Sequence, residues 1–286
     1  MKNDEESMRS DFAAWRDRKL AAWAEVSRDP IVEVGDIKAP TAAEEGELRR
    51  RCRLANLAVY SCRKPVGKGD LLAFAARFGL KDLDANALAD DDGVTPLAVA
   101  ADGARSRYIP YTDRPIAWHT DGYYNESVDQ VRGLVLHCAR PAARGGANTV
   151  MDHEIAWLLL RDENPAHVEA LARPDAMTIP PNDDEGLTRG ARGGPVFSFP
   201  GGALHMRYTA RKRNVAWSDD PGVRAAVACL ERLLAADGPH QIRHRLEAGQ
   251  GLLCNNVLHD RQPFEDEAGA PRLLWRARFR DRIEST

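Results

Sequence analysis

The sequence lacks long hydrophobic runs and a strong excess of either charge. Its 286 residues contain no stretch that approaches the roughly 20 apolar residues of a membrane-spanning helix. The 40 basic and 43 acidic residues give a formal net charge of −3, so a nucleic-acid or membrane-surface binder is not expected. The first residues, MKNDEESMRSDF, are polar and acidic and have no apolar segment typical of a signal peptide. We therefore expect a cytoplasmic protein, with homo-oligomer formation left open.

Paired cysteines are also missing. The five cysteines are widely spread and never form a CxxC motif: Cys52, Cys62, Cys138, Cys229 and Cys254. A disulfide framework or a structural zinc site needs closely spaced, paired thiols. We expect reduced, mostly buried thiols, and any metal must be held by other ligands.

The chain does have the composition of a protein with a sizeable core. Hydrophobic residues make up 43% and charged residues 29% of the chain, which is typical of soluble globular proteins. No internal repeat or linker divides it, so we predict one domain over residues 1–286. Periodicity predicts helices at 5–26, 42–57 and 68–78 and strands at 31–37 and 58–62. Residues 1–106 are expected to decorate the core, and the Asp-, Ala- and Gly-rich stretch 82–106 is expected to be a loop that covers the active site as a lid.

The second half of the chain changes character. Short apolar runs at 133–138, 176–179, 195–199 and 251–254 alternate with turns that contain Gly and Pro. Two helices are predicted to interrupt them, one after Asn164 and Pro165 and one from Pro221 to Ala236. Short strands with outer helices predict a mainly β protein with peripheral α-helices, built on a barrel-like or jelly-roll core.

Two segments carry candidate metal ligands. In the segment 114–124, RPIAWHTDGYY, an extended backbone would project His119 and Asp121 to the same side. A second histidine would complete the two-histidine, one-carboxylate set of non-heme Fe(II) oxygenases. His259 ends the apolar run of the segment 251–261, GLLCNNVLHDR, and its position suits this third ligand. The alternative is a histidine that only caps the strand through backbone hydrogen bonds.

A third segment, 271–280, is rich in arginine. Read as a strand, it places Arg272, Leu274, Arg276, Arg278 and Arg280 on one side and Leu273, Trp275, Ala277 and Phe279 on the other. The second side is expected in the core. The inner arginines are expected to bind an anionic ligand, because guanidinium pairs with carboxylate through two parallel hydrogen bonds. Arg278 and Arg280 are expected to be solvated.

Together, the motifs HTDGYY, LHC, GGANTVMD, NNVLHDR and RLLWRARF resemble the taurine dioxygenase superfamily of Fe(II)/2-oxoglutarate-dependent oxygenases, which includes gamma-butyrobetaine hydroxylase. The resemblance implies a double-stranded β-helix, the jelly-roll or cupin-like core. It implies Fe(II) held by His119, Asp121 and His259. It also implies that Thr149 and Arg272 hold the distal carboxylate of 2-oxoglutarate.

Arg276 matches a second arginine of taurine dioxygenase-like members. Four residues of extended chain separate Arg272 from Arg276 by about 13 Å, more than the cosubstrate spans, so Arg276 is placed nearer the metal or the substrate. The LHC stretch is more similar to the gamma-butyrobetaine side of the superfamily. The subgroup therefore stays open.

The resemblance implies a dioxygenase that uses Fe(II), 2-oxoglutarate and O2 to hydroxylate a small polar metabolite, anionic or betaine-like, with release of succinate and CO2. A zinc hydrolase could use the same three ligands, although it has no need of the clamp formed by Thr149 and Arg272. The other alternative is a non-catalytic jelly-roll protein that binds a metabolite.

Two groups of residues are candidates for substrate binding. The segment 204–214 carries Arg207, Arg211, Lys212 and Arg213, which would suit a sulfonate, phosphonate or carboxylate, or would form a solvated loop. Arg207 is the favoured one because it shares strand parity with His205. Tyr123, Tyr124 and Trp217 could instead cage a quaternary ammonium group.

Overall fold

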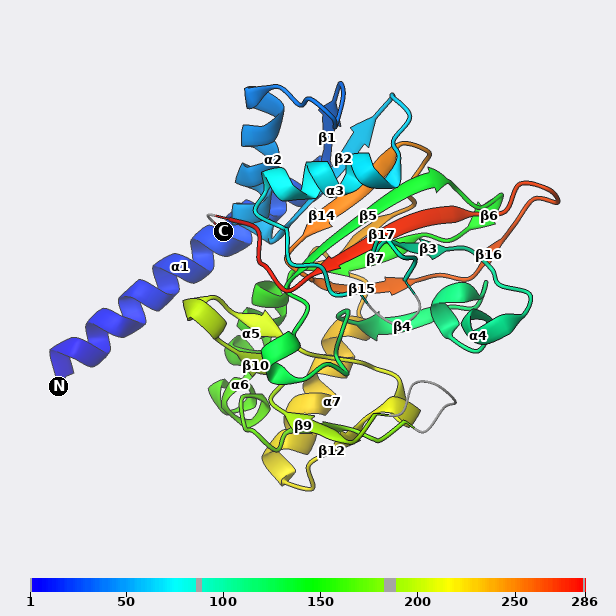
Figure 1. The fold of residues 1–286 in the computed structure, drawn as a ribbon. Helices are drawn as coiled ribbons and strands as arrows, with labels where there is room; N and C mark the ends of the chain where they lie inside the picture. Colours follow the sequence, from blue (N-terminus) through cyan, green and yellow to red (C-terminus); the bar gives the residue numbers. More distant parts are fainter. Residues whose placement is uncertain (1, 86–88, 183–188, 285) are drawn as a thin grey trace.

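The computed structural model describes residues 2–85, 89–182, 189–284 and 286. The chain begins with three helices and two strands, drawn in blue to cyan in Figure 1: α1 (Lys2–Arg28), β1 (Ile31–Val34), α2 (Ala42–Ala55), β2 (Leu57–Cys62) and α3 (Lys68–Arg77). The order and bounds predicted for this part are confirmed to within a few residues. Within the described ranges, no helix is long and apolar enough to cross a bilayer.

Local chemistry fixes the bounds of α2. The Thr41 hydroxyl accepts a hydrogen bond from the Glu44 amide at 3.3 Å, and the Glu44 carboxylate accepts one from the Thr41 amide at 2.7 Å. This reciprocal pair satisfies two amides that the first helical turn cannot. The helix ends at Asn56, whose φ of 57° is left-handed. β2 follows immediately.

A six-stranded sheet forms one half of the core. Its order is β1-β2-β14-β5-β17-β3, and only β1 and β2 pair in parallel. The further strands are β14 (Gln250–Cys254), β5 (Gly133–Arg140), β17 (Leu273–Phe279) and β3 (Thr95–Leu97). Residues alternate between the two faces: Tyr60 and Val135 join a cluster with Phe74 of α3, while Val59 and Leu136 join the opposite cluster. The sheet is therefore covered on both sides.

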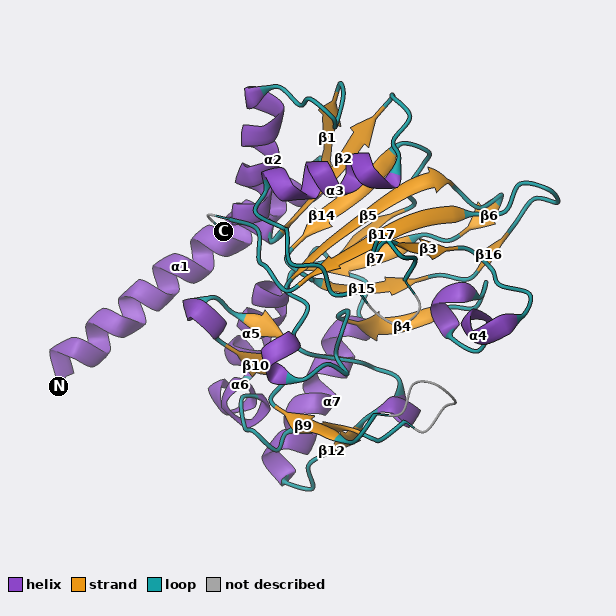
Figure 2. Ribbon diagram, in the orientation of Figure 1, coloured by secondary structure: helices purple, strands orange, loops and turns teal. Residues whose placement is uncertain are grey.

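A four-stranded sheet faces it and completes the jelly roll. Its order is β13-β7-β15-β4, with β13 (Ile242–His244), β7 (Asn148–Met151), β15 (Leu258–Arg261) and β4 (Ile116–His119). Leu136 and Leu252 from the large sheet and Val150 and Ile242 from the small one belong to the same apolar cluster. Figure 2 shows the strands gathered in the middle and the helices outside them. The predicted mainly β fold with a jelly-roll core is confirmed.

The described second half of the chain contains three α-helices, one more than the two that were predicted. The predicted helices are α6 (Pro165–Leu171) and α7 (Pro221–Ala235), and a third, α5 (His153–Glu163), was missed. Asp152, the last residue of the GGANTVMD motif, caps α5 by accepting a hydrogen bond from the Glu154 amide at 2.8 Å. The helix was missed because α5 begins only two residues after β7 ends, so no loop in the sequence marks the boundary between them.

Short elements connect these parts. They are α4 (Gly103–Ser106), β6 (Arg144–Gly145), β8 (Met177–Ile179), β9 (Arg192–Gly194), β10 (Phe197–Ser198), β11 (His205–Met206), β12 (Ala216–Trp217) and β16 (Phe264–Glu265). The stretch predicted as a loop at 82–106 contains β3, which pairs with β17 through Thr95 and Arg276, and α4. Its residues 86–88 lie outside the described residues. The lid stays a prediction.

Candidate active site

The small sheet brings the two distant histidines together. β4 and β15 are antiparallel neighbours, and His119 is the direct partner of His259 in their register. The two imidazole rings lie with centroids 4.2 Å apart. Directly opposed residues in an antiparallel pair project to the same face, so the fold itself generates the pair.

Asp121 joins them from the turn after β4. Gly122 has a φ of 67°, and a Cβ there would lie 2.5 Å from a Val131 methyl, so the turn requires glycine. Asn256 holds the Asp121 backbone: its Oδ1 accepts the Asp121 N–H at 2.8 Å, and its Nδ2 donates to the Asp121 carbonyl at 2.9 Å. No role was predicted for Asn256 from the sequence, and these two hydrogen bonds make it a positioning residue.

The donor atoms suit a divalent metal. One ligand atom from each of His119, Asp121 and His259 lies within 4.8 Å of the others. Each histidine places Nδ1 against a backbone carbonyl, at 3.0 Å for His119 and 2.9 Å for His259. Nδ1 must carry the proton because a carbonyl only accepts, so Nε2 has the free lone pair. Oδ2 of Asp121 is buried and has no hydrogen-bond partner among the described residues. These groups fit Fe(II), with Nε2 of both histidines and the Asp121 carboxylate as its ligands.

Electrostatics keeps the donors in the form that binds metal. Burial, followed by the charge of His259, lowers the pKa of His119 to about 3. Burial alone would raise the pKa of Asp121, but the nearby positive charges, that of Arg276 first, outweigh it and hold this pKa well below its usual range. At neutral pH His119 is therefore a neutral imidazole and Asp121 a carboxylate.

Arg276 lies against the candidate metal site. It projects from β17, and its Nη1 lies 3.2 Å from Oδ1 of Asp121. The sequence placed Arg276 near the metal or the substrate, and this contact agrees with the first position.

Arg272 and Thr149, the predicted clamp for 2-oxoglutarate, are both buried. Thr149 lies on β7 beside Val150, which pairs with His259. The Arg272 side chain packs its guanidinium over the Phe264 ring at 4.9 Å. This guanidinium forms no hydrogen bond or ion pair with any other residue that the structure describes, and burial lowers its pKa. An uncompensated buried cation is costly unless an anion pairs with it.

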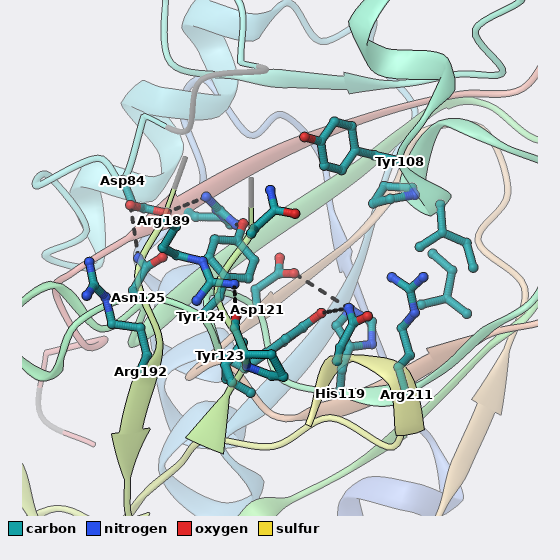
Figure 3. Close-up of a pocket in the computed structure, with 18 of the residues that line it drawn as sticks. Asp84, Tyr108, His119, Asp121, Tyr123, Tyr124, Asn125, Arg189, Arg192 and Arg211 are labelled. Carbon is teal, nitrogen blue, oxygen red and sulfur yellow. Dashed lines mark hydrogen bonds and ion pairs between the residues drawn. The ribbon is translucent and has the colours of Figure 1, made fainter. Parts of the chain in front are cut away.

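A cavity of about 930 Å³ opens on the site. His119, Asp121 and Arg276 lie in its wall, with Tyr123 and Tyr124 next to them (Figure 3). Its described lining contains eight arginines and only four acidic residues. The cavity therefore favours an anionic occupant.

The predicted substrate residues separate in the structure. Tyr123 lines the cavity, and its hydroxyl accepts a hydrogen bond from Asn214 at 2.9 Å. Arg207 is buried outside the cavity lining, and its guanidinium donates to the carbonyls of Tyr123 at 2.7 Å and Arg192 at 2.6 Å. These bonds favour a structural role for Arg207 over the predicted contact with substrate. Trp217 is also absent from the described lining and packs beside Tyr208.

The prediction that Arg278 and Arg280 are solvated was wrong for Arg278. Its side chain is only 2% exposed and contacts Asp84 at 2.5 Å and the Tyr124 hydroxyl at 2.8 Å. Arg280 is 31% exposed and pairs with Asp82 at 3.0 Å. Both line the cavity, because the segment near Asp84 covers the side of β17 that was taken to face water.

Fold and site together define a class. A jelly roll that brings two histidines and one carboxylate together, with Arg276 at 3.2 Å from the carboxylate, is the arrangement of the non-heme Fe(II) oxygenases that use 2-oxoglutarate. The comparisons with known proteins agree. The chain belongs to the taurine catabolism dioxygenase TauD, TfdA family, whose model matches residues 33–278.

Two relatives and one solved structure illustrate what the chain is similar to. A uridine-5'-phosphate dioxygenase from Amycolatopsis is 34% identical over 173 residues, which cover 57% of this chain and 60% of the relative. A uridine-5'-phosphate dioxygenase from Streptomyces is 30% identical over 200 residues, covering 66% of this chain and 70% of the relative. The chain thus aligns with less than two thirds of the first relative's length. The crystal structure of an asparagine oxygenase in complex with Fe(II), 3-hydroxyasparagine and succinate matches with a TM-score of 0.62 at 15% identity, covering 92% of this chain and 90% of that one. This last likeness is one of fold.

Proposed function

We propose that the protein is an Fe(II)- and 2-oxoglutarate-dependent dioxygenase that hydroxylates a small anionic metabolite, with release of succinate and CO2. His119, Asp121 and His259 converge on one point, and His119 and Asp121 lie in the wall of the large cavity; this arrangement carries the proposal. Two imidazoles and one carboxylate leave coordination positions open on one side. When bound, iron and 2-oxoglutarate supply the oxidising chemistry, while the chain orients and shields the reactants.

The chain's own residues have three tasks in this reaction. The side chains of His119, Asp121 and His259 hold the metal, and Arg276 compensates part of the Asp121 charge. The buried guanidinium of Arg272, with the Thr149 hydroxyl, holds the distal carboxylate of 2-oxoglutarate.

The cavity favours an anionic substrate over a betaine. Its described lining has twice as many arginines as acidic residues. A quaternary ammonium group would need a free aromatic face, yet the Tyr124 ring already has the guanidinium groups of Arg189 and Arg278 at 5.9 Å each. Both named relatives are uridine-5'-phosphate dioxygenases. We therefore propose a nucleoside 5'-monophosphate as the substrate class.

Succinate release tests this function. Purified protein with Fe(II), 2-oxoglutarate and O2 is expected to release succinate at least about tenfold faster with uridine 5'-monophosphate than with uridine, because only the former brings the charge that the arginines bind. Asp121→Ala, which removes a metal ligand, is expected to abolish the release.

Two negative outcomes have different meanings. Equal stimulation by both compounds, or by neither, would reject the substrate class. No consumption of 2-oxoglutarate with any compound would reject the dioxygenase, and it is the result expected of a zinc hydrolase or a binding protein.

We also propose a cytoplasmic location and small-molecule partners. All five cysteines are free and buried, which suits a reducing compartment. Formation of a homo-oligomer stays a prediction.

A further inference from the structure

Each acidic residue in the described lining of the cavity has an arginine partner. Their charges are thus compensated within the wall itself. The pairs are Asp84 with Arg278 at 2.5 Å, Asp121 with Arg276 at 3.2 Å, Glu126 with Arg192 at 2.8 Å, and Asp129 with Arg280 at 3.2 Å.

Some arginines of the lining have no such partner. In the described parts of the chain, no carboxylate pairs with Arg189, Arg211 or Arg213. The Arg189 guanidinium donates hydrogen bonds to the carbonyls of Pro180 and Gly190, at 3.0 and 3.2 Å. Arg211 and Arg213 have no side-chain hydrogen bond to a described residue. In the described lining, Arg211 and Arg213 are thus two cations with neither a carboxylate partner nor a side-chain hydrogen bond to a described residue.

The backbone carries Arg211 to the metal site. Thr209 forms a β-bridge with His119, and hydrogen bonds flank it from Ala210 N–H to the Trp118 carbonyl at 2.8 Å and from Thr120 N–H to the Tyr208 carbonyl at 3.0 Å. Residues two apart on a strand share a face, and diagonal neighbours in an antiparallel pair lie about 7–8 Å apart, within reach of a long side chain. Arg211 is therefore a diagonal neighbour of His119. Figure 3 shows the two side by side, with the Arg211 guanidinium directed into the cavity.

A side-chain hydrogen bond ties the rest of this segment to the same place. Asn214, which follows Arg213, donates to the Tyr123 hydroxyl at 2.9 Å. Tyr123 is two residues beyond the candidate ligand Asp121. We call the segment 211–214 the arginine loop. The β-bridge between Thr209 and His119 holds the chain just before it, and the hydrogen bond from Asn214 to Tyr123 holds its end.

We propose that Arg211 and Arg213 form the subsite for the anionic group of the substrate, a phosphate monoester or similar dianion. Guanidinium binds phosphate through paired, charge-assisted hydrogen bonds, and both residues have all their donors available. The anion then lies on the His119 side of the cavity. Because His119 is a candidate metal ligand, the carbon atom to be oxidised is one close to the phosphate group. The identity of the substrate rests on the proposed function, while the anion site does not.

Equilibrium binding to metal-free protein tests the subsite without any catalytic step. Calorimetric titration uses inorganic phosphate, uridine 5'-monophosphate and uridine against wild type, Arg211→Gln, Arg213→Gln and the double variant. We expect each single variant to weaken binding of both phosphate compounds about tenfold or more, and the double variant to weaken it further. Affinity for uridine should not change. Lys212→Gln, an exposed cation of the same loop outside the described lining, is the matched control and should bind like wild type.

Three results would overturn the proposal: wild type that binds neither phosphate compound, Arg211 and Arg213 variants with wild-type affinity, or an equal loss in Lys212→Gln, which would indicate a general charge effect. Thermal unfolding of each variant verifies that it is folded. Arg211→Lys, which keeps the charge without the paired geometry, should recover part of the affinity. Failure of the dioxygenase activity would show separately as absence of 2-oxoglutarate turnover in wild type, with the phosphate titrations still interpretable.

Discussion

Single residues of the site are distinguished by which of their atoms have partners. Arg261 and Arg272 are both buried and pack against the Phe264 ring, at 5.0 and 4.9 Å. Arg261 donates to the carbonyls of Thr112 at 2.6 Å and Pro110 at 3.3 Å. Arg272 has no such bond to the described residues. Two similar side chains thus have different tasks, one structural and one open to a ligand.

Substituting each arginine by methionine separates these tasks. Arg272→Met is expected to raise the concentration of 2-oxoglutarate needed for half-maximal succinate release about tenfold or more, because the distal carboxylate loses its cation. Its thermal stability should be kept or increased, because a buried unpaired charge is removed. Arg261→Met is expected to lower stability, because it leaves carbonyls without donors, and to change the 2-oxoglutarate requirement little. The reverse pattern would move the clamp to Arg261.

Residue types at strand spacing could be read from the sequence, but their surroundings could not. Alternation along 114–124 placed His119 and Asp121 on one side, and Nε2 of His119 lies 3.7 Å from Oδ1 of Asp121. The same argument favoured Arg207 through its parity with His205, yet the relevant neighbour is His119, whose bridge to Thr209 directs Arg211 into the cavity. That bridge joins segments 90 residues apart in sequence, and no local pattern reports it.

Among the elements, the turn between β14 and β15 positions the backbone of a candidate metal ligand. Asn256 adopts a φ of 50° there, and its amide bonds the Asp121 backbone on both sides and the Val131 carbonyl at 2.6 Å. Removing it leaves three buried backbone groups without partners. The turn that precedes β15 therefore positions Asp121, which follows β4.

Asn256→Ala is expected to lower the free energy of unfolding by about 1–3 kcal/mol and the affinity for Co(II), a spectroscopic substitute for Fe(II), about tenfold to a hundredfold. Asn255→Ala is the matched control, because Asn255 is equally buried but bonds Asn56 at 2.9 Å and Ile283 at 3.0 Å instead. It should lose stability with little change in metal affinity. Equal losses of metal affinity in both variants would make Asn256 an ordinary core residue.

Helices whose first residues include a capping residue in a recognisable sequence pattern were predicted well. Thr41 with Glu44 begins α2, and Asp220 with Pro221 begins α7 where the sequence indicated. α5 was missed because its cap, Asp152, directly follows β7. The pairing of β4 with β15, which creates the site, joins segments about 140 residues apart, and no local sequence pattern predicts it.

For the molecule as a whole, the two facing sheets supply most of the side chains that form the candidate metal and 2-oxoglutarate sites. The large sheet supplies Arg276, and the small sheet supplies both histidines and Thr149. Apolar side chains of both sheets fill the space behind them, so the ligands project from a rigid wall. The cavity on the other side is lined by strand residues, among them Arg276 and Arg278 of β17, and by connecting segments, and its arginines adapt this wall to an anion.

The central claim is that His119, Asp121 and His259 bind one Fe(II) that 2-oxoglutarate then chelates. Anaerobic addition of Fe(II) and 2-oxoglutarate to the wild-type protein is expected to produce a weak visible charge-transfer band, and His259→Ala is expected to lack it while keeping its circular dichroism spectrum. A folded wild-type protein without the band, or a His259→Ala variant that retains it, would contradict the account.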